Sequence, residues 1–194
     1  MNAAVTGTSQ ASSPTQWQID PAHSAAHFSV RHLMISNVRG EFGKVSGNVV
    51  LDPSDLTKST VEVSVDATTI NTREPQRDEH LRSADFFDVA NHPAITFRSK
   101  QITTAGAGRF KVTGDLTIHG VTKEVVLDVD GPSAPIKDPW GNQRTAASAS
   151  AKINRQDYGV KWNATMDNGG VVVGDDVAIT IDVEMIQPAA KAGN

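Results

Sequence analysis

RDEHLRSADFFDVANHPAITFRS, residues 77–99, is the stretch that decides the fold. Charges crowd its first half, two adjacent phenylalanines follow, and after Pro93 the chain reads as an extended strand. We expect a short helix from about Glu74 to Ala84, with Pro75 in its first turn. Because most of the flanking sequence alternates like β-strands, this helical insert is expected either to plug one end of a β structure or to cover a cavity.

The flanking segments alternate between apolar and polar residues with the period of two that is typical of half-buried strands. The clearest is Ser59–Ile70, STVEVSVDATTI. The other predicted strands are Trp17–Asp20, His23–Leu33, Arg39–Asp52, the segment with Ile95 and Phe97, Phe110–His119, 125–129, Thr145–Ile153 and Val177–Met185. About eight or nine strands predict an all-β fold: an extended antiparallel eight-stranded lipocalin-like barrel with a short helical insert. A two-sheet sandwich would show the same alternation.

Two of these strands carry features beyond alternation. In Arg39–Asp52, Phe42 has the opposite parity from Val45, and a β-bulge near Gly43 would return Phe42 to the inner face. Trp17–Asp20 is expected as an edge strand. Since a free edge can pair or pack with a second copy, a homodimer is a further expectation.

Length and composition favour one folded domain. The chain has 194 residues, 38% of them hydrophobic, and a net charge of −4. We expect a disordered polar tail over 1–16, the barrel domain over 17–187 and a C-terminal tail over 188–194. No basic stripe is available for nucleic acid, and no apolar run is long enough to span a membrane.

The ends of the sequence bear on localisation. Residues 1–16 show neither the positive n-region nor the apolar h-region of a secretory signal, so the sequence as written predicts a cytoplasmic protein. A different true N-terminus would allow a periplasmic one. The sequence contains no cysteine, which excludes disulfides and thiolate chemistry.

Small side chains predict unfilled space inside the barrel. Thr145–Ile153 is built from very small residues, and Ala25, Ala26 and Gly114 add further small side chains to the predicted barrel wall. The space would be an apolar cavity for a hydrophobic chain, unless these small residues only make room for large neighbours. The residues expected to line it are Phe28, Val30, Phe42, Val63, Val65, Phe97, Leu116, Ile118, Ala147, Ala149 and Ile179. Phe86 and Phe87 are expected to close one end, and Arg31 and Arg155 to meet a polar or anionic head group at the mouth.

We expect no catalytic residues. Asp78, Glu79, Asp85 and Asp88 surround the insert, where they are interpreted as helix caps and helix-terminus charges. The alternative is an enzyme that acts on a small hydrophobic substrate in the same cavity, with one of these carboxylates as acid or base.

We also expect no metal site, unless ligands that are distant in sequence converge in space. His23 and His27 share a strand face but lie roughly 13 Å apart at the rise of a strand, too far for one ion. His80, His92 and His119 are scattered along the sequence.

Several motifs in one order resemble the YceI-like family. They are HSAAHFSVRHL at 23–33, GEF at 40–42, RDEHLRSADFF at 77–87, HPAITFRS at 92–99, GDLTIHGVTK at 114–123 and DPWG at 138–141. The resemblance covers about residues 17–187. It implies a lipocalin-like barrel that holds a polyisoprenoid, such as a polyprenyl quinone or polyprenyl phosphate, and that acts without cofactor or catalysis as a carrier, storage or stress-related lipid-binding protein. Transient membrane contact is also implied. Many relatives carry a secretory signal, which residues 1–16 do not resemble.

Overall fold

The computed structural model describes residues 13–167 and 169–188. Of the two predicted tails, residues 1–12 and 189–194 lie outside the described residues. The strands are β1 (Thr15–Ile19), β2 (Ala25–His32), β3 (Ser36–Phe42), β4 (Val45–Leu51), β5 (Thr60–Asp66), β6 (Ile70–Asn71), β7 (Ala94–Gly106), β8 (Arg109–Ile118), β9 (Val121–Asp130), β10 (Ile136–Lys137), β11 (Gln143–Asn154) and β12 (Val173–Gln187). The helix α1 spans Pro75–Arg82, and short 3-10 turns cover Leu56–Lys58 (η1), Ala67–Thr69 (η2) and Arg155–Tyr158 (η3).

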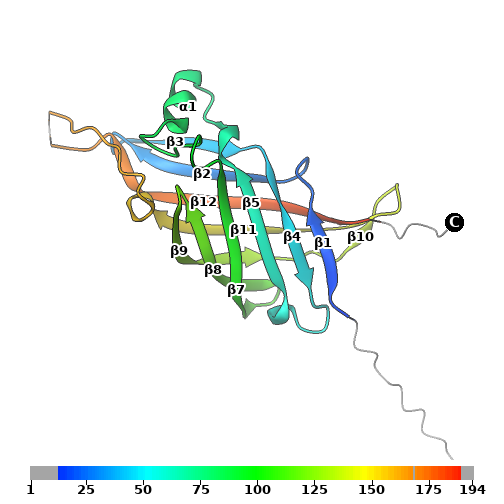
Figure 1. Cartoon of the computed structure of the whole chain (residues 1–194). Helices are drawn as coiled ribbons and strands as arrows, with labels where there is room; N and C mark the ends of the chain where they lie inside the picture. The colour runs from blue at the N-terminus through cyan, green and yellow to red at the C-terminus, as the bar shows by residue number, and fades with distance from the viewer. Residues whose placement is uncertain (1–12, 168, 189–194) are drawn as a thin grey trace, which may run out of the picture.

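These strands form one closed antiparallel barrel (Figure 1). The order is β10-β11-β9-β8-β7-β5-β4-β1-β12-β2-β3-β6, and pairing of β11 with β12 from Gln143↔Gln187 to Asn154↔Asp176 closes the circle. Three positions of the circle are each filled by two successive segments, β1 with β2, β3 with β4, and β5 with β6. The barrel therefore has eight positions, which confirms the predicted fold.

The two ends of the barrel differ in what covers them. At one end, here called the α1 end, lie α1, the segment 83–93, the β8–β9 turn at 119–120 and η3. The opposite end, here called the β10 end, carries β10, the β7–β8 turn and the β4–β5 connection with η1. Figure 1 shows α1 at the top of the view and β10 well away from it on the right.

The helix forms close to its predicted place. It begins at Pro75, after Glu74, whose carboxylate accepts a hydrogen bond from the Gln76 N–H at 3.4 Å. Proline suits the first turn because its missing N–H would lack a helical partner there. The helix ends at Arg82. No helix in the described part of the chain has the length and apolar character needed to cross a membrane.

Two strand predictions are corrected. Phe42 does face the interior, with 6% exposure, but through a break in the strand and not through a bulge. Beyond the break at Gly43 and Lys44, β4 pairs with β1 and β5, whereas β3 pairs with β2 and β6. The prediction that Trp17 lies on an edge strand is wrong, because β1 pairs with β4 on one side and β12 on the other. A homodimer through a free β1 edge therefore has no structural basis.

The inner faces supply two clusters of buried apolar side chains. One includes Trp17, Val45 and Ile70, and the other includes Phe97, Leu116 and Tyr158. Gly114 is one of the small residues expected to leave space. A Cβ added there would lie 2.6 Å from Cζ of Phe97, so this glycine makes room for a large neighbour.

Candidate functional site

A cavity of about 650 Å³ runs inside the barrel between the two apolar clusters. This volume is in the range of sites that enclose small organic ligands. Every residue predicted to line the interior or the mouth does border the cavity: Phe28, Val30, Arg31, Phe42, Val63, Val65, Phe86, Phe87, Phe97, Leu116, Ile118, Ala147, Ala149, Arg155 and Ile179. Their role as ligand contacts stays a prediction.

The wall beside β11 is thin because of its small side chains. Ala147 and Ala149 are half-buried, lie two residues apart and border the cavity, as the period of a strand requires. Opposite them in the ladder, Val183 and Ile181 of β12 also border the cavity. Small residues on one strand and β-branched residues on the next thus leave room along this wall.

Aromatic side chains gather where the cavity reaches the α1 end. The His80 ring contacts Phe86 at 5.1 Å and Trp162 at 4.9 Å between centroids, and Phe86 contacts Trp162 at 5.2 Å. Phe87 meets Phe42 edge-on at 5.6 Å. We call these five side chains the aromatic cluster. It places the predicted Phe86–Phe87 pair between the insert and the barrel wall.

The cavity-facing side of α1 carries a cation that sequence reasoning missed. Arg77, His80 and Leu81 all border the cavity. Their spacing of three and four residues puts them on one helix face, and this signal was available in the sequence. Arg77 is half-buried, and it donates from Nε to Thr72 Oγ1 at 2.8 Å and from Nη2 to the Thr72 carbonyl at 2.9 Å.

The two arginines predicted for the mouth have different surroundings. Arg155 is 6% exposed, and its guanidinium donates to the carbonyls of Val160, Trp162, Val173 and Gly174 and to the Asp175 carboxylate. These contacts use all five guanidinium N–H groups, so Arg155 fixes the loop after η3 and has no donor left for a head group.

Arg31 is exposed and donates from Nε to the Met34 carbonyl at 3.2 Å.

One residue that borders the cavity carries a buried hydroxyl. Tyr158 is 2% exposed and borders the cavity, and its hydroxyl has no hydrogen-bond partner among the described residues. Burial, together with the nearby Asp157 charge, raises the pKa of Tyr158 to about 12. The hydroxyl is therefore a neutral donor that a polar atom of a bound molecule would satisfy.

The carboxylates around the insert hold local structure. Asp78 is 7% exposed and accepts from the Thr72 N–H at 2.8 Å, and Glu79 forms an exposed ion pair with Arg82. Asp85 Oδ2 lies 2.9 Å from His80 Nε2, and it thereby orients the ring inside the aromatic cluster. None of these three carboxylates is among the residues that border the cavity.

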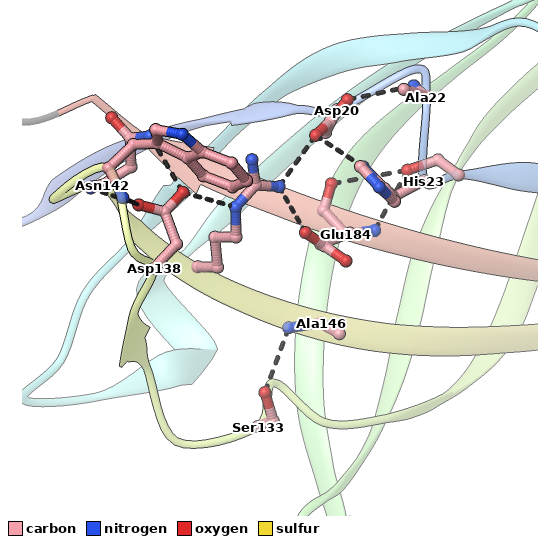
Figure 2. Close-up of polar contacts among 11 residues, drawn as sticks. Asp20, Ala22, His23, Ser133, Asp138, Asn142, Ala146 and Glu184 are labelled. Carbon is pink, nitrogen blue, oxygen red and sulfur yellow. Dashed lines mark hydrogen bonds and ion pairs between the residues drawn. The ribbon is translucent and has the colours of Figure 1, made fainter.

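On the outside of the barrel, near the β10 end, one arginine binds three carboxylates (Figure 2). Arg144 contacts Asp138 and Asp20 at 2.8 Å each, and it also contacts Glu184. These residues come from the loop before β11, the chain after β1 and the strand β12. The cluster therefore ties together three segments that are distant in sequence. We call it the Arg144 network.

The network has electrostatic consequences for its acids. Burial raises the pKa of Asp138, but hydrogen bonds from Arg144 and Asn142 outweigh it and lower the pKa to about 2. Hydrogen bonds from Arg144 and His23 lower the pKa of Asp20 to about 2 as well. Both carboxylates therefore stay ionised well into the acid range.

The fold brings together two of the histidines that are scattered along the sequence. The rings of His92 and His119 lie 5.0 Å apart between centroids at an angle of 73°. His92 precedes β7, and His119 occupies the β8–β9 turn. Only the antiparallel return of the chain brings them together, so their spacing in sequence gave no signal.

Comparisons with known proteins agree with this architecture. A family model described as the YceI-like domain matches residues 17–185. A UPF0312 protein of Vibrio cholerae is 35% identical over 161 residues, which cover 82% of this chain and 85% of that protein.

Two solved structures share the fold. The crystal structure of a Campylobacter jejuni YceI protein is 32% identical, with a TM-score of 0.68, and the match covers 81% of this chain and 89% of that chain. A polyisoprenoid binding domain from Saccharophagus degradans, implicated in plant cell wall breakdown, is 18% identical with a TM-score of 0.64, covering 89% of this chain and 98% of that one. With the family model matched across the whole barrel, the chain belongs to the YceI-like family.

Proposed function

We propose that this protein binds an isoprenoid lipid of the polyprenyl quinone or polyprenyl phosphate type in its barrel cavity, as a carrier, storage or stress-related lipid-binding protein. The single observation that carries the proposal is a cavity of about 650 Å³ lined almost wholly by aliphatic and aromatic side chains. Burying apolar surface stabilises a complex by about 25 cal/mol per Å², so each isoprene unit that enters adds to the affinity. The name of the Saccharophagus degradans domain supports the same ligand class.

The polar groups at the α1 end suit the head of such a lipid. Arg77 and Tyr158 both border the cavity there and carry N–H and O–H donors. A quinone carbonyl or a phosphate oxygen accepts hydrogen bonds from groups of this kind. The tail would then extend between the two apolar clusters toward the β10 end.

The proposal is tested by organic extraction of the purified, untagged protein and mass spectrometry of the extract. A polyprenyl species at one molecule per chain is the expected result, and it also names the ligand. An extract without lipid from a folded preparation, which then also fails to take up added polyprenyl lipid, would contradict the proposal.

Ala147→Trp gives a matched test of where the lipid lies. The indole would fill the cavity beside β11, so we expect lipid binding to be lost from a barrel that still folds. Ala146→Trp is the control, because Ala146 precedes it in the same strand and is exposed. Equal lipid content in the two variants would place the ligand elsewhere.

A second candidate function rests on the pair His80 and Asp85. An imidazole that borders the cavity and lies 2.9 Å from a carboxylate is an arrangement that general base catalysis uses. Asp85→Asn distinguishes the two functions. Lipid binding is expected to survive, since Asp85 is outside the cavity, whereas turnover of a hydrophobic substrate that this variant abolishes would favour the enzyme.

Membrane contact during lipid exchange has support from one turn. Met34 and Ile35, between β2 and β3, are 53% and 76% exposed. Large apolar side chains at the tip of a turn are suited to enter the interfacial layer of a bilayer. Replacing both by serine is expected to slow lipid transfer from vesicles without reducing the lipid content at equilibrium, and an unchanged transfer rate would contradict this contact.

A further inference from the structure

Three metal-ligating side chains meet at the α1 end of the barrel, outside the cavity. They are Asp88 and His92, from the segment that joins α1 to β7, and His119 from the β8–β9 turn. One carboxylate oxygen and one nitrogen from each imidazole lie within 4.8 Å of one another, and all three residues are half-buried. The fold therefore converges two imidazoles and one carboxylate from two separate segments.

Unusual backbone conformations hold two of the three residues in place. Asp88 and His119 have φ values of 45° and 51°, in the left-handed region that non-glycine residues seldom adopt. Next to His119, Gly120 has φ of 74°, and a Cβ there would come within 2.6 Å of Cε1 of His92. Glycine at this position lets the His92 imidazole lie directly against the turn. Residues held in rare conformations by their surroundings gather at functional sites.

Local hydrogen bonds orient the carboxylate. The Asp88 carbonyl accepts from the N–H groups of Asn91 at 3.0 Å and His92 at 2.8 Å, which folds His92 back toward Asp88. Asp88 Oδ2 accepts from Asn91 Nδ2 at 2.8 Å, while no side chain within residues 13–167 and 169–188 forms a hydrogen bond with Oδ1. Outer contacts of this type commonly fix the ligands of a metal ion.

The Asp88 carboxylate has no ion-pair partner among the described residues. Among the described residues, no Lys, Arg or His nitrogen lies within the 4.0 Å of an ion pair with Asp88, and no hydrogen bond joins His92 to His119. The three ligand atoms thus face one another without bonding to one another. A half-buried carboxylate beside two imidazoles favours a bound cation.

A second cluster of potential ligands differs, because its ligand atoms already have partners in the protein. Asp20, His23 and Glu184 satisfy the same proximity of ligand atoms. There, the Arg144 guanidinium binds both carboxylates, and His23 Nδ1 lies 2.9 Å from Asp20 Oδ2, so these ligand atoms already have partners. For this reason, the Asp20 cluster provides the control residue for the test below.

We propose that Asp88, His92 and His119 form a binding site for a divalent transition-metal ion of the Zn²⁺ type, with the remaining coordination position open to water. Two imidazoles and one carboxylate are a donor set that such ions prefer. Bonds of about 2.1 Å in a tetrahedral site place ligand atoms roughly 3.4 Å apart, so small side-chain shifts complete it from the observed separation. The ion would join the segment that carries Phe86 and Phe87 to the β8–β9 hairpin.

The test uses untagged full-length protein dialysed against a chelator. Zn²⁺ is titrated by calorimetry, and Co²⁺ is used as a second probe whose visible absorption reports its ligands. Wild type is expected to bind one ion per chain. Asp88→Asn and His119→Asn are expected to weaken binding by more than the roughly 100-fold that loss of an outer-sphere partner can cause. Asparagine is chosen because it tolerates the left-handed conformation of both positions.

His23→Asn is the matched control, and it is expected to bind Zn²⁺ with wild-type affinity. Thermal unfolding of the metal-free variants checks the fold, and His92→Gln replaces any variant that does not fold. Zn²⁺ is expected to raise the melting temperature of wild type and His23→Asn only. Absence of binding to wild type, or equal binding to the Asp88, His92 and His119 variants, would overturn the site.

Discussion

The Arg144 network and the aromatic cluster hold opposite ends of the barrel by different forces. The network joins three segments through charge-assisted hydrogen bonds from one guanidinium, with Asp138 only 5% exposed. Such contacts depend on direction and are costly to break once buried. The aromatic cluster consists of ring contacts, each of which contributes only about 0.5–1.5 kcal/mol beyond the area it buries. The difference predicts that the α1 end opens more readily than the β10 end.

Arg144→Met is expected to have the largest effect. Removing the cation leaves three carboxylates close together without a counter-ion, and we expect this to lower the free energy of unfolding more than the loss of an exposed ion pair does. Urea denaturation measures the loss. Arg98→Met is the control, because Arg98 is 77% exposed in its ion pair with Glu62 and is expected to cost less than about 1 kcal/mol. Equal losses of unfolding free energy in the two variants would show that the Arg144 network stabilises the fold no more than a surface ion pair does.

Phe87→Ala is expected to have a smaller effect on stability, of about 2 kcal/mol, because the side chain is half-buried. Its effect on ligand release is expected to exceed that of Arg144→Met, with release up to about 10-fold faster as the contact with Phe42 is lost. Stopped-flow displacement of a fluorescent apolar probe measures the rate. If Arg144→Met accelerates release as much, the assignment of the opening end is wrong.

Lowering the pH is expected to have the smallest and most gradual effect on the stability of the folded protein. The pKa values of Asp20 and Asp138 are lowered to about 2 in the folded protein, below their ordinary value of 3.8. The stability they contribute is therefore complete above the ordinary value and is lost as pH falls through about 2. Melting temperatures measured from pH 6 to pH 2 should decline at the acid end, and Asp138→Asn should flatten the decline. A decline of the same steepness in this variant would assign the effect to other acids.

The alternation of apolar and polar residues predicted which side chains face the barrel interior, because this pattern depends only on the local geometry of a strand. Val63, Leu116 and Ile179 border the cavity, as a period of two requires. The break between β3 and β4 was missed, because a parity change at Phe42 has the same appearance in sequence whether the strand bulges or ends.

Contacts between segments that are distant in sequence could not be predicted from the alternation of apolar and polar residues. Arg155 reads in sequence as a free cation near a strand end, but carbonyls from two later segments occupy its guanidinium. His92 and His119 meet only because β7, β8 and the preceding segment fold back on one another. Such contacts depend on the closed barrel, and no repeating pattern in the sequence predicts them.

The closing strand sets the order in which the protein can be completed. β12, the last 15 residues of the barrel, pairs with β11 on one side and with β1 and β2, from the start of the chain, on the other. Synthesis delivers N-terminal strands first, and pairing between distant strands is slow. Until β12 emerges, the growing chain therefore lacks the strand that joins β11 to β1 and β2 and closes the barrel. A chain that ends before Val173 would lack the seam, and it would present two unpaired edges to its neighbours in the cell.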